Sequence, residues 1–206
     1  MMAKDEYIIT ELFEEKVAEY TGSPYAIAVD NCSNALFLCL MYVGIKGKTI
    51  HIPSCTYMSV PCAVINAGGI VDFTDRPFQG IYYLSPTKVI DAALRFTWDM
   101  YIEKSFMCLS FTGPYKHLKL GKGGMILTDN KDAYEWFKKA RNSGRNECSY
   151  MDDDFQMTGW NFYMPPETAA RGVQLMRGFY SPDGSAKFMT DAKGTYPDLS
   201  KFKVYQ

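Results

Sequence analysis

Short apolar runs that alternate with polar turns and helical stretches constrain this chain more than any other feature. The run Tyr25–Val29 is followed by a polar turn and by an apolar stretch that ends at Gly44. The cycle then repeats, with a second run at Thr49–Ile52, a helical stretch over 57–67 and a third run at Ile70–Phe73. Strand–turn–helix–strand units at this spacing are typical of a parallel sheet with helices on its faces. We therefore predict an α/β fold of three α/β/α layers around a mostly parallel central sheet.

The rest of the chain adds strands and helices of the same kind, and then changes character. Further strands are predicted at 88–90, 106–110 and 124–128, and further helices at 7–20, 131–141 and 167–177. From Ser181 onward Gly, Pro, Ser and Lys dominate. We therefore expect one domain over residues 1–180 and a short C-terminal tail over 181–206, which we expect to be loosely packed or dependent on a partner.

Composition excludes several classes of function. The 206 residues carry a net charge of −1, with 47% hydrophobic residues, so no broad positive field exists for nucleic acid or an anionic membrane. No apolar run is long enough to span a bilayer, and residues 1–15 lack the apolar core of a signal peptide. Six cysteines without a CxxC pair, and only two histidines, argue against a zinc site and for a reducing compartment. We expect a cytoplasmic protein, in the host cytoplasm if the chain is viral.

Chemically useful side chains follow the first two predicted strands. Ligands of open parallel sheets bind outside the carboxyl ends of the strands. Ser33 and Asn34 follow the first strand and lead into a helix, where free N–H groups and a hydroxyl suit a phosphate. Either residue could instead be only the N-cap of that helix. Tyr57 follows the second strand and could lie against a flat ring or belong to the core.

The later strand ends add an acid and an amine. Asp91 ends the strand at 88–90 beside small residues, where a buried carboxylate needs a partner; it could also be a helix cap or part of a structural ion pair. Ser110 and Lys116 follow the strand at 106–109. A phosphate cradle, a flat aromatic, a carboxylate and a lysine together fit pyridoxal 5′-phosphate (PLP), whose aldehyde forms a Schiff base with lysine.

The order of several motifs resembles one family. The stretches that carry the resemblance are AIAVDNCSNALFLCL, IHIPSCTYMSVPCAVINAGGIVDFTD, VIDAA, SFTGPYKHLKLGKGG, ILTDN, ARNSGR and GWNFYMPPETAARGVQL. In this order they resemble the DegT/DnrJ/StrS family of PLP-dependent sugar-nucleotide aminotransferases, which have the aspartate-aminotransferase (type I) fold. The resemblance runs from about Glu11 to Arg177. It implies a PLP-binding large domain whose C-terminal small domain is reduced or missing.

The resemblance also implies roles for individual residues. Lys116 would hold the cofactor covalently and carry protons, and Asp91 would pair with the pyridine nitrogen. The other implied contacts are stacking by Tyr57 and phosphate binding by Ser33, Asn34 and Ser110. Asn161 would reach the phosphate in a neighbouring subunit, which implies a homodimer. The implied reaction moves an amino group from glutamate to a keto sugar linked to a nucleotide, for amino-sugar or surface-glycan synthesis.

The chain departs from the family pattern at several places. Cys32 stands where the family has glycine, Leu94 where it has Gln or His, Lys122 where it has Glu and Tyr163 where it has Arg. One extra residue separates Ser110 from Lys116. Leu94, Lys122 and the missing C-terminal domain favour an alternative, in which the chain is a catalytically reduced PLP- or ligand-binding homologue acting as a regulatory or partner subunit. A third possibility is an unrelated α/β scaffold in which Lys116 is merely solvated.

Overall fold

The structure, a computed structural model, describes residues 5–205. The first four residues of the predicted N-terminal stretch, and Gln206 of the predicted tail, lie outside the described residues. The longer elements are the helices α1 (Asp5–Thr21), α2 (Cys32–Val43), α3 (Ser59–Asn66), α4 (Lys131–Ala140) and α5 (Pro166–Met176) and the strands β1 (Tyr25–Val29), β2 (Thr49–Pro53), β3 (Ile70–Thr74), β6 (Phe106–Ser110) and β7 (Gly124–Thr128). Shorter elements are β4 (Tyr82–Tyr83), β5 (Val89–Asp91) and the 3₁₀ turns η1 (Arg177–Phe179), η2 (Leu199–Lys201) and η3 (Lys203–Tyr205). All six strands and five helices predicted from the sequence are confirmed within a few residues.

The central sheet is mixed. Its five strands lie in the order β1-β7-β6-β5-β4. Only β5 and β6 pair in parallel, whereas β7 is antiparallel to both of its neighbours and β4 is antiparallel to β5. The strands β1, β5 and β6 nevertheless point the same way, because β1 and β6 both run against β7. The α/β class is confirmed, but the mostly parallel pairing expected from the sequence is interrupted by these two reversed strands.

The strands β2 and β3 form a separate parallel pair. Two backbone hydrogen bonds between His51 and Ser85 join β2 to the chain just after β4. The predicted strand–helix–strand unit at 49–73 is therefore present, but β1 is not its neighbour. This difference arises because β1 pairs with β7, which comes about 100 residues later in the chain.

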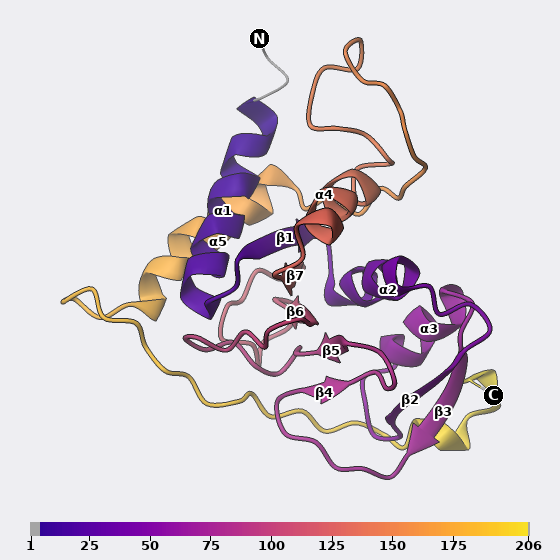
Figure 1. Cartoon of the computed structure of the whole chain (residues 1–206). Helices are drawn as coiled ribbons and strands as arrows, with labels where there is room; N and C mark the ends of the chain where they lie inside the picture. The colour runs from indigo at the N-terminus through magenta and orange to yellow at the C-terminus, as the bar shows by residue number, and fades with distance from the viewer. Residues whose placement is uncertain (1–4, 206) are drawn as a thin grey trace.

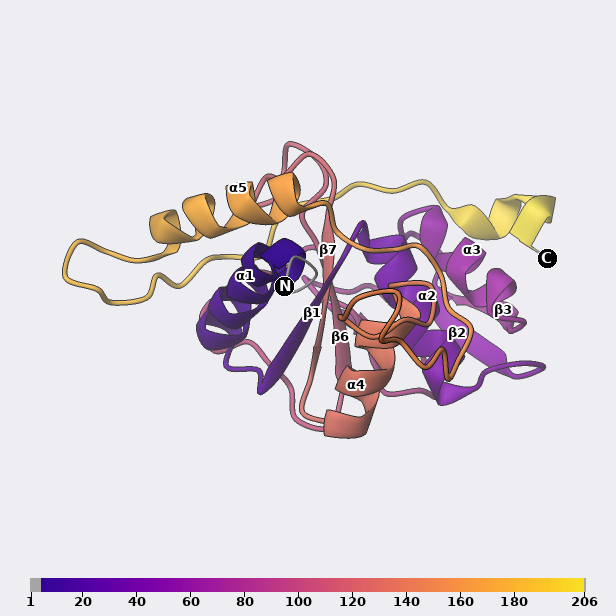
Figure 2. The same ribbon diagram turned by 90° about the horizontal axis from the view of Figure 1, so that it is seen from above.

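Helices cover both faces of the sheet and make the three predicted layers. Figures 1 and 2 show α1 and α5 on one face and α2 and α4 on the other, with α3 beyond α2. Two apolar clusters fill the space between the layers, one under α1 and α5 and one under α2, α3 and α4. Successive residues of β7 alternate between them, since Met125 and Leu127 join the first cluster and Ile126 the second.

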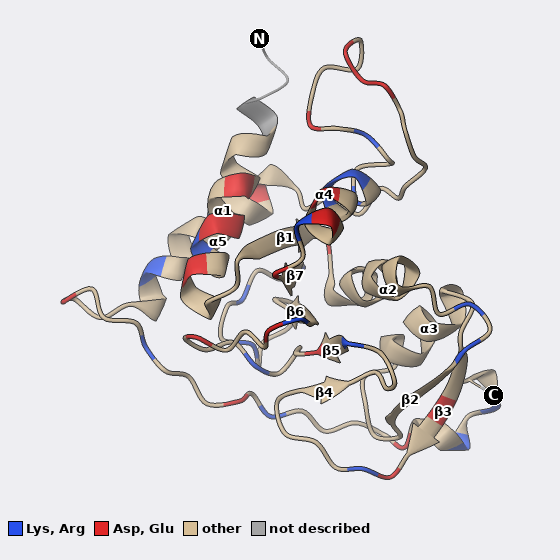
Figure 3. Ribbon diagram, in the orientation of Figure 1, with Lys and Arg blue, Asp and Glu red and all other residues tan. Residues whose placement is uncertain are grey.

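Charged side chains are spread over the surface except on two helices. Figure 3 shows no charged residue on α2 or α3, in agreement with their sequences CSNALFLCLMYV and SVPCAVIN. Apolar residues such as Leu36, Leu38 and Leu40 bury α2 between the sheet and α3. This uncharged helix therefore fixes the end of β1, where α2 begins, relative to the sheet.

The tail beyond Ser181 packs against the domain, in contrast to the expected loose packing. Its Leu199 is buried, and its Asp191 forms two hydrogen bonds with Arg95 at 2.7 and 2.8 Å. Within residues 5–205 no group of three or more His, Cys, Asp and Glu could hold a metal ion. No helix in the same range is both long and apolar enough to cross a membrane.

Candidate active site

The carboxyl ends of β1, β5 and β6 lie at one edge of the sheet. The register places Val29 of β1, Gly124 of β7 and Ser110 of β6 side by side at this edge. Asp91 pairs with Cys108, two residues before Ser110, at the end of the neighbouring β5. Because β1, β5 and β6 point the same way, the residues that follow them converge there.

A pocket of about 1080 Å³ opens at this edge. Six of the seven predicted site residues line it: Ser33, Asn34, Tyr57, Asp91, Ser110 and Lys116. The seventh, Asn161, does not. It is exposed and pairs through its backbone with Asn142, beyond α4. A role for Asn161 towards a neighbouring subunit therefore stays a prediction.

The start of α2 forms one wall of the pocket. The side chain of Asn31 caps the helix by accepting a hydrogen bond from the Asn34 N–H at 2.8 Å. The N–H groups of Cys32 and Ser33, in the first turn, are then left without a partner inside the helix. Ser33 also donates its hydroxyl hydrogen to Ser59 at 2.5 Å. The N-cap of α2 is therefore Asn31, and neither Ser33 nor Asn34. The free N–H groups at this helix end can still bind an anion.

Gly124 allows this wall to approach the sheet. A Cβ at position 124 would lie 2.6 Å from the backbone nitrogen of Cys32 and equally close to the peptide of Asn31. Real Cβ contacts essentially never fall below 3.0 Å. A glycine at this position of β7 is therefore needed for the first turn of α2 to sit at the strand end.

Asp91 is the only buried acid of the pocket among the described residues. Its side chain is 5% exposed and accepts hydrogen bonds from the Ala93 N–H and the Tyr82 hydroxyl, both at 2.8 Å. No cation lies within ion-pair distance in the described chain. Burial raises the pKa of Asp91, while the two hydrogen bonds and the nearby charge of Lys116 act in the opposite direction. Asp91 is thus a buried acid that lacks a counter-ion.

Lys116 reaches the same pocket from the loop after β6. Its Nζ donates a hydrogen bond to the carbonyl oxygen of Ala93, two residues beyond Asp91. Burial lowers the pKa of Lys116, and the nearby Cys32 and Asp91 oppose that shift. A partly desolvated amine of this kind is closer to its neutral, nucleophilic form than a solvated lysine. This environment disagrees with the alternative of a merely solvated lysine.

Tyr57 and Ser110 complete the predicted set. Tyr57 is 50% exposed, and its ring contacts the Tyr196 ring edge-on at a centroid distance of 6.2 Å. It is therefore not a core aromatic. The Ser110 hydroxyl accepts a long hydrogen bond, 3.4 Å, from the Thr112 N–H.

The departures from the family pattern have distinct surroundings. Cys32 and Leu94 line the pocket, and the Cys32 thiol donates to the Cys108 carbonyl at 3.6 Å. Lys122 also lines the pocket and forms an ion pair with Asp30 at 3.5 Å. Tyr163, in contrast, contacts Thr10 and the guanidinium of Arg141, away from the pocket.

The sequence analysis missed three contributors to the site. Tyr82 hydrogen-bonds to Asp91 and, through a 2.5 Å contact, to Thr56. Lys193 and Tyr196 belong to the tail and line the pocket. Nothing in the local pattern marks the tail residues, and Tyr82 lies on a strand of two residues, which is too short to be predicted from periodicity.

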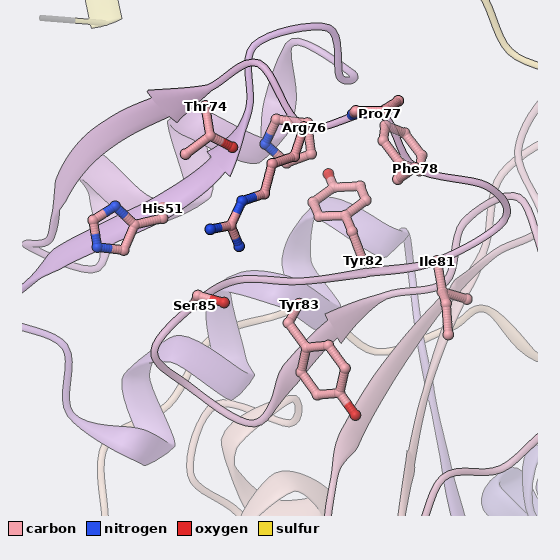
Figure 4. Close-up of a pocket in the computed structure, with 10 residues that line it drawn as sticks. His51, Thr74, Arg76, Pro77, Phe78, Ile81, Tyr82, Tyr83 and Ser85 are labelled. Carbon is pink, nitrogen blue, oxygen red and sulfur yellow. The ribbon is translucent and has the colours of Figure 1, made fainter.

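A second, smaller pocket lies on the other side of Tyr82. It measures about 430 Å³ and is lined by residues of β2, the segment after β3, and β4. Figure 4 shows Arg76 extending between His51, Tyr82 and Ser85, with Phe78 beside the Tyr82 ring. None of the predicted site residues lines this pocket. Tyr82 lines this second pocket, and its hydroxyl reaches Asp91 of the larger one.

The chain has the fold of the type I PLP-dependent aminotransferases. Among solved structures, Helicobacter pylori PseC, an aminotransferase involved in the biosynthesis of pseudoaminic acid, superposes with a TM-score of 0.65 at 13% identity. NtdA from Bacillus subtilis, solved with bound PMP, gives a TM-score of 0.68 at 21% identity. Each alignment covers 82% of this chain, with 57% of PseC and 48% of NtdA.

The sequence comparison gives the family. The profile of the DegT/DnrJ/EryC1/StrS aminotransferase family matches residues 5–93 and 103–181, and the chain belongs to this family. A relative from Campylobacter jejuni, UDP-4-amino-4,6-dideoxy-N-acetyl-beta-L-altrosamine transaminase, is 21% identical over 208 aligned positions. That alignment covers 80% of this chain and 55% of the relative. The chain therefore spans little more than half the length of this relative.

Proposed function

We propose that this protein is a PLP-dependent aminotransferase that moves an amino group from glutamate to a keto sugar linked to a nucleotide, for amino-sugar or surface-glycan synthesis. The observation that carries the proposal is the buried Asp91 without a counter-ion, in one pocket with a desolvated Lys116. Membership of the family and the description of the C. jejuni relative as a transaminase support the substrate class.

The residues of the pocket fit PLP. A pyridine nitrogen that is protonated would supply the cation that Asp91 lacks. The free N–H groups at the start of α2 and the hydroxyls of Ser33 and Ser110 would hold the phosphate. Lys116 would attach the cofactor through its amine, and Tyr57 would cover the ring.

The residues of the chain then have defined tasks in catalysis. Bound PLP supplies an electron-withdrawing ring that stabilises negative charge at the carbon next to the transferred nitrogen. Asp91 would pair with the ring nitrogen and favour its protonated form. Lys116, whose pKa burial lowers, would act as the general acid and base that moves the proton at Nζ. The hydrogen bonds from Tyr82 and Ala93 fix the orientation of the Asp91 carboxylate.

A second candidate is a catalytically reduced homologue that binds PLP or another ligand as a regulatory or partner subunit. The side chain of Leu94 favours it, because an apolar group lines the pocket where the family places a polar one. This candidate shares the pocket with the first and differs from it in lacking turnover.

We further propose a homodimer in the cytoplasm. Support for the dimer comes from exposed apolar side chains beside the pocket, Tyr57 at 50% and Met58 at 54% exposure. Sedimentation at micromolar concentration tests it, and a monomer would contradict both the dimer and the role predicted for Asn161.

The visible absorption spectrum tests the enzymatic proposal. Purified protein mixed with PLP is expected to develop the visible band of lysine-bound PLP, and Lys116→Ala is expected to lose it. Lys119→Ala is the matched control, since Lys119 is an exposed lysine of the same loop outside the pocket. L-glutamate should then convert the band to the pyridoxamine spectrum.

The outcomes separate the candidates. A wild-type protein that never shows the band would reject the aminotransferase and leave only a homologue that binds another ligand. A band that forms but does not respond to L-glutamate would favour the non-catalytic homologue.

A further inference from the structure

The segment 187–199, here called the strap, crosses the mouth of the pocket. It is the yellow trace in Figures 1 and 2 that runs from beyond α5 to η2. Four consecutive strap residues, 193–196, line the pocket together with the ends of β5 and β6 and the start of α2. One wall of the candidate active site is therefore supplied by a segment without helix or strand.

Several hydrogen bonds hold the first half of the strap. The Tyr20 hydroxyl donates to the Lys187 carbonyl at 2.6 Å, and the Met189 N–H donates to the Thr97 hydroxyl at 2.7 Å. Beyond these, the Ala192 N–H donates to the Leu94 carbonyl at 2.7 Å. This last bond attaches the strap three residues after Asp91, next to the pocket.

A bidentate ion pair strengthens the same anchor. Arg95 donates from Nε and Nη2 to the two carboxylate oxygens of Asp191. Gly80 gives that carboxylate room, because a Cβ at position 80 would overlap it. Planar pairs of this kind are stronger and more directional than single hydrogen bonds.

The second half of the strap is held at Leu199. Its N–H donates to the Ser54 carbonyl at 2.8 Å, and its side chain is 3% exposed. Between Ala192 and Leu199 the described structure gives no hydrogen bond from residues 193–197 to the rest of the chain. The strap is thus fixed at both ends and spans the pocket between them.

Two of the strap residues that line the pocket carry ionisable side chains, Lys193 and Tyr196. The Tyr196 phenol folds back over Gly194, where a Cβ would lie 2.6 Å from its hydroxyl oxygen. Burial raises the pKa of Tyr196, and the charge of Asp91 adds to the shift, which places this phenol within electrostatic reach of the buried acid. Lys193 lies on the other side of Gly194 and is exposed.

Lys193 is the unassigned cation of the pocket. The other charged residues that line it already have roles, since Asp91 and Lys116 serve the cofactor and Lys122 is paired with Asp30. Within the described residues Lys193 has no hydrogen-bond or ion-pair partner. An amine on the wall of a binding pocket, without an acid paired to it, suits an oxyanion of a ligand.

We propose that the strap is a substrate-binding wall and that Lys193 binds an oxyanion of the substrate, either a carboxylate of the amino donor or a phosphate of the nucleotide. Arg95 and Asp191 are positioning residues that hold Lys193 over the pocket. This inference rests on the proposed function for the nature of the substrate, but the strap itself rests on contacts within this chain.

Isothermal titration with two unreactive probes tests the proposal. Glutarate carries the two carboxylates of glutamate without its amine, and uridine diphosphate (UDP) carries the phosphates of a nucleotide sugar. Lys193→Gln is expected to weaken binding of one probe by about tenfold or more, as for loss of a hydrogen bond to a charged group. The probe that responds identifies the source of the oxyanion.

The matched control is Lys201→Gln. Lys201 lies just beyond the strap, is paired with Asp198, and does not line the pocket. It should leave both affinities unchanged. If Lys193→Gln changes neither affinity by more than twofold, or if the wild type binds neither probe, the proposal is overturned.

Releasing the anchor gives a second measurement. Asp191→Asn should weaken the same probe and should also speed tryptic cleavage after Lys193, because the strap then opens more often. Cleavage and affinity that both match the wild type would reject a positioning role for Asp191.

Failure of this inference is distinct from failure of the proposed function. Binding that depends on Lys193 in a protein that never develops the PLP band would support the strap and reject the aminotransferase. A normal PLP band, together with probe affinities that are the same in wild type and Lys193→Gln, would support PLP binding and reject the role of Lys193.

Discussion

The hydroxyl of Tyr82 lies 2.8 Å from Oδ2 of Asp91, with both side chains buried. Tyr82 and Asp91 are also register partners in the antiparallel pair β4–β5. The short hairpin that reverses β4 therefore places a hydrogen-bond donor on the acid that would face the cofactor. The Tyr82 ring packs on Phe78 at a centroid distance of 4.5 Å, so the same residue also forms part of the second pocket.

Tyr82→Phe should weaken PLP binding. The hydrogen bond from Tyr82 lowers the pKa of Asp91, so its loss moves that pKa further up and leaves less carboxylate to pair with the ring nitrogen. We expect about a fivefold weaker affinity, as for loss of one hydrogen bond, and a shift of the pH dependence of binding to higher pH. Titrating PLP into both proteins at several pH values measures this. Equal affinities at every pH would show that Tyr82 does not support Asp91.

Asp91→Asn should change how stability depends on pH when no PLP is present. Burial raises the pKa of Asp91, so the folded chain holds this proton more tightly than the unfolded chain does. The associated stability is present below the ordinary Asp value of 3.8 and is lost as the pH rises through the raised pKa. The amide of the variant cannot titrate, so the variant does not lose stability in this way. The free energy of unfolding of the variant, relative to wild type, should therefore increase as the pH rises from 3.8 through the raised pKa of Asp91.

Urea unfolding between about pH 4 and about pH 8 measures this difference. Asp152→Asn, which removes an exposed acid, controls for the change in surface charge. A stability difference between Asp91→Asn and wild type that is the same at every pH would show that the Asp91 carboxyl titrates normally in the folded chain.

The elements of the fold could be predicted because each carries its own local signal. Apolar runs such as Met125–Leu127 and end signals such as Gly44 depend only on neighbouring residues. The direction of β4 could not be predicted, because two residues carry no periodicity. The pairing of β1 with β7 joins segments that are far apart in the sequence, and no local pattern predicts it.

The site divides in the same way. The strand ends supply Asp91, Ser110 and the start of α2, and these residues could be found from the sequence because each lies at or directly after the end of an apolar run. The strap could not be found, because its position depends on distant partners such as Arg95 and Ser54 rather than on its own sequence. A stretch rich in Gly, Pro and Ser predicts only irregular backbone.

Alkylation should separate the cysteines by burial. Burial raises the pKa of Cys32 and Cys108 well above the usual thiol range, and Cys39 is fully buried, with its sulfur 3.6 Å from that of Cys108. The exposed Cys55 and Cys62 have open access to reagent. We expect iodoacetamide at neutral pH to modify Cys55 and Cys62 first and to spare Cys32, Cys39 and Cys108.

Peptide mass spectrometry after a short exposure measures the order of modification. The unfolded chain, in which all six thiols are accessible, is the control for intrinsic reactivity. Modification of Cys32 as fast as Cys55 would mean that the pocket wall at the start of α2 opens in solution.

Gly124→Ala should damage the phosphate end of the site while leaving the rest of the fold in place. The added Cβ would overlap the peptide between Asn31 and Cys32, which is backbone and cannot turn aside as a side chain can. Overpacking of this kind costs about 1–3 kcal/mol and would displace the first turn of α2. PLP affinity should therefore fall by more than the loss of stability alone explains. Gly178→Ala is the control, because a Cβ there meets nothing within 4 Å. A Gly124→Ala protein with wild-type PLP affinity would show that the start of α2 is not where the phosphate binds.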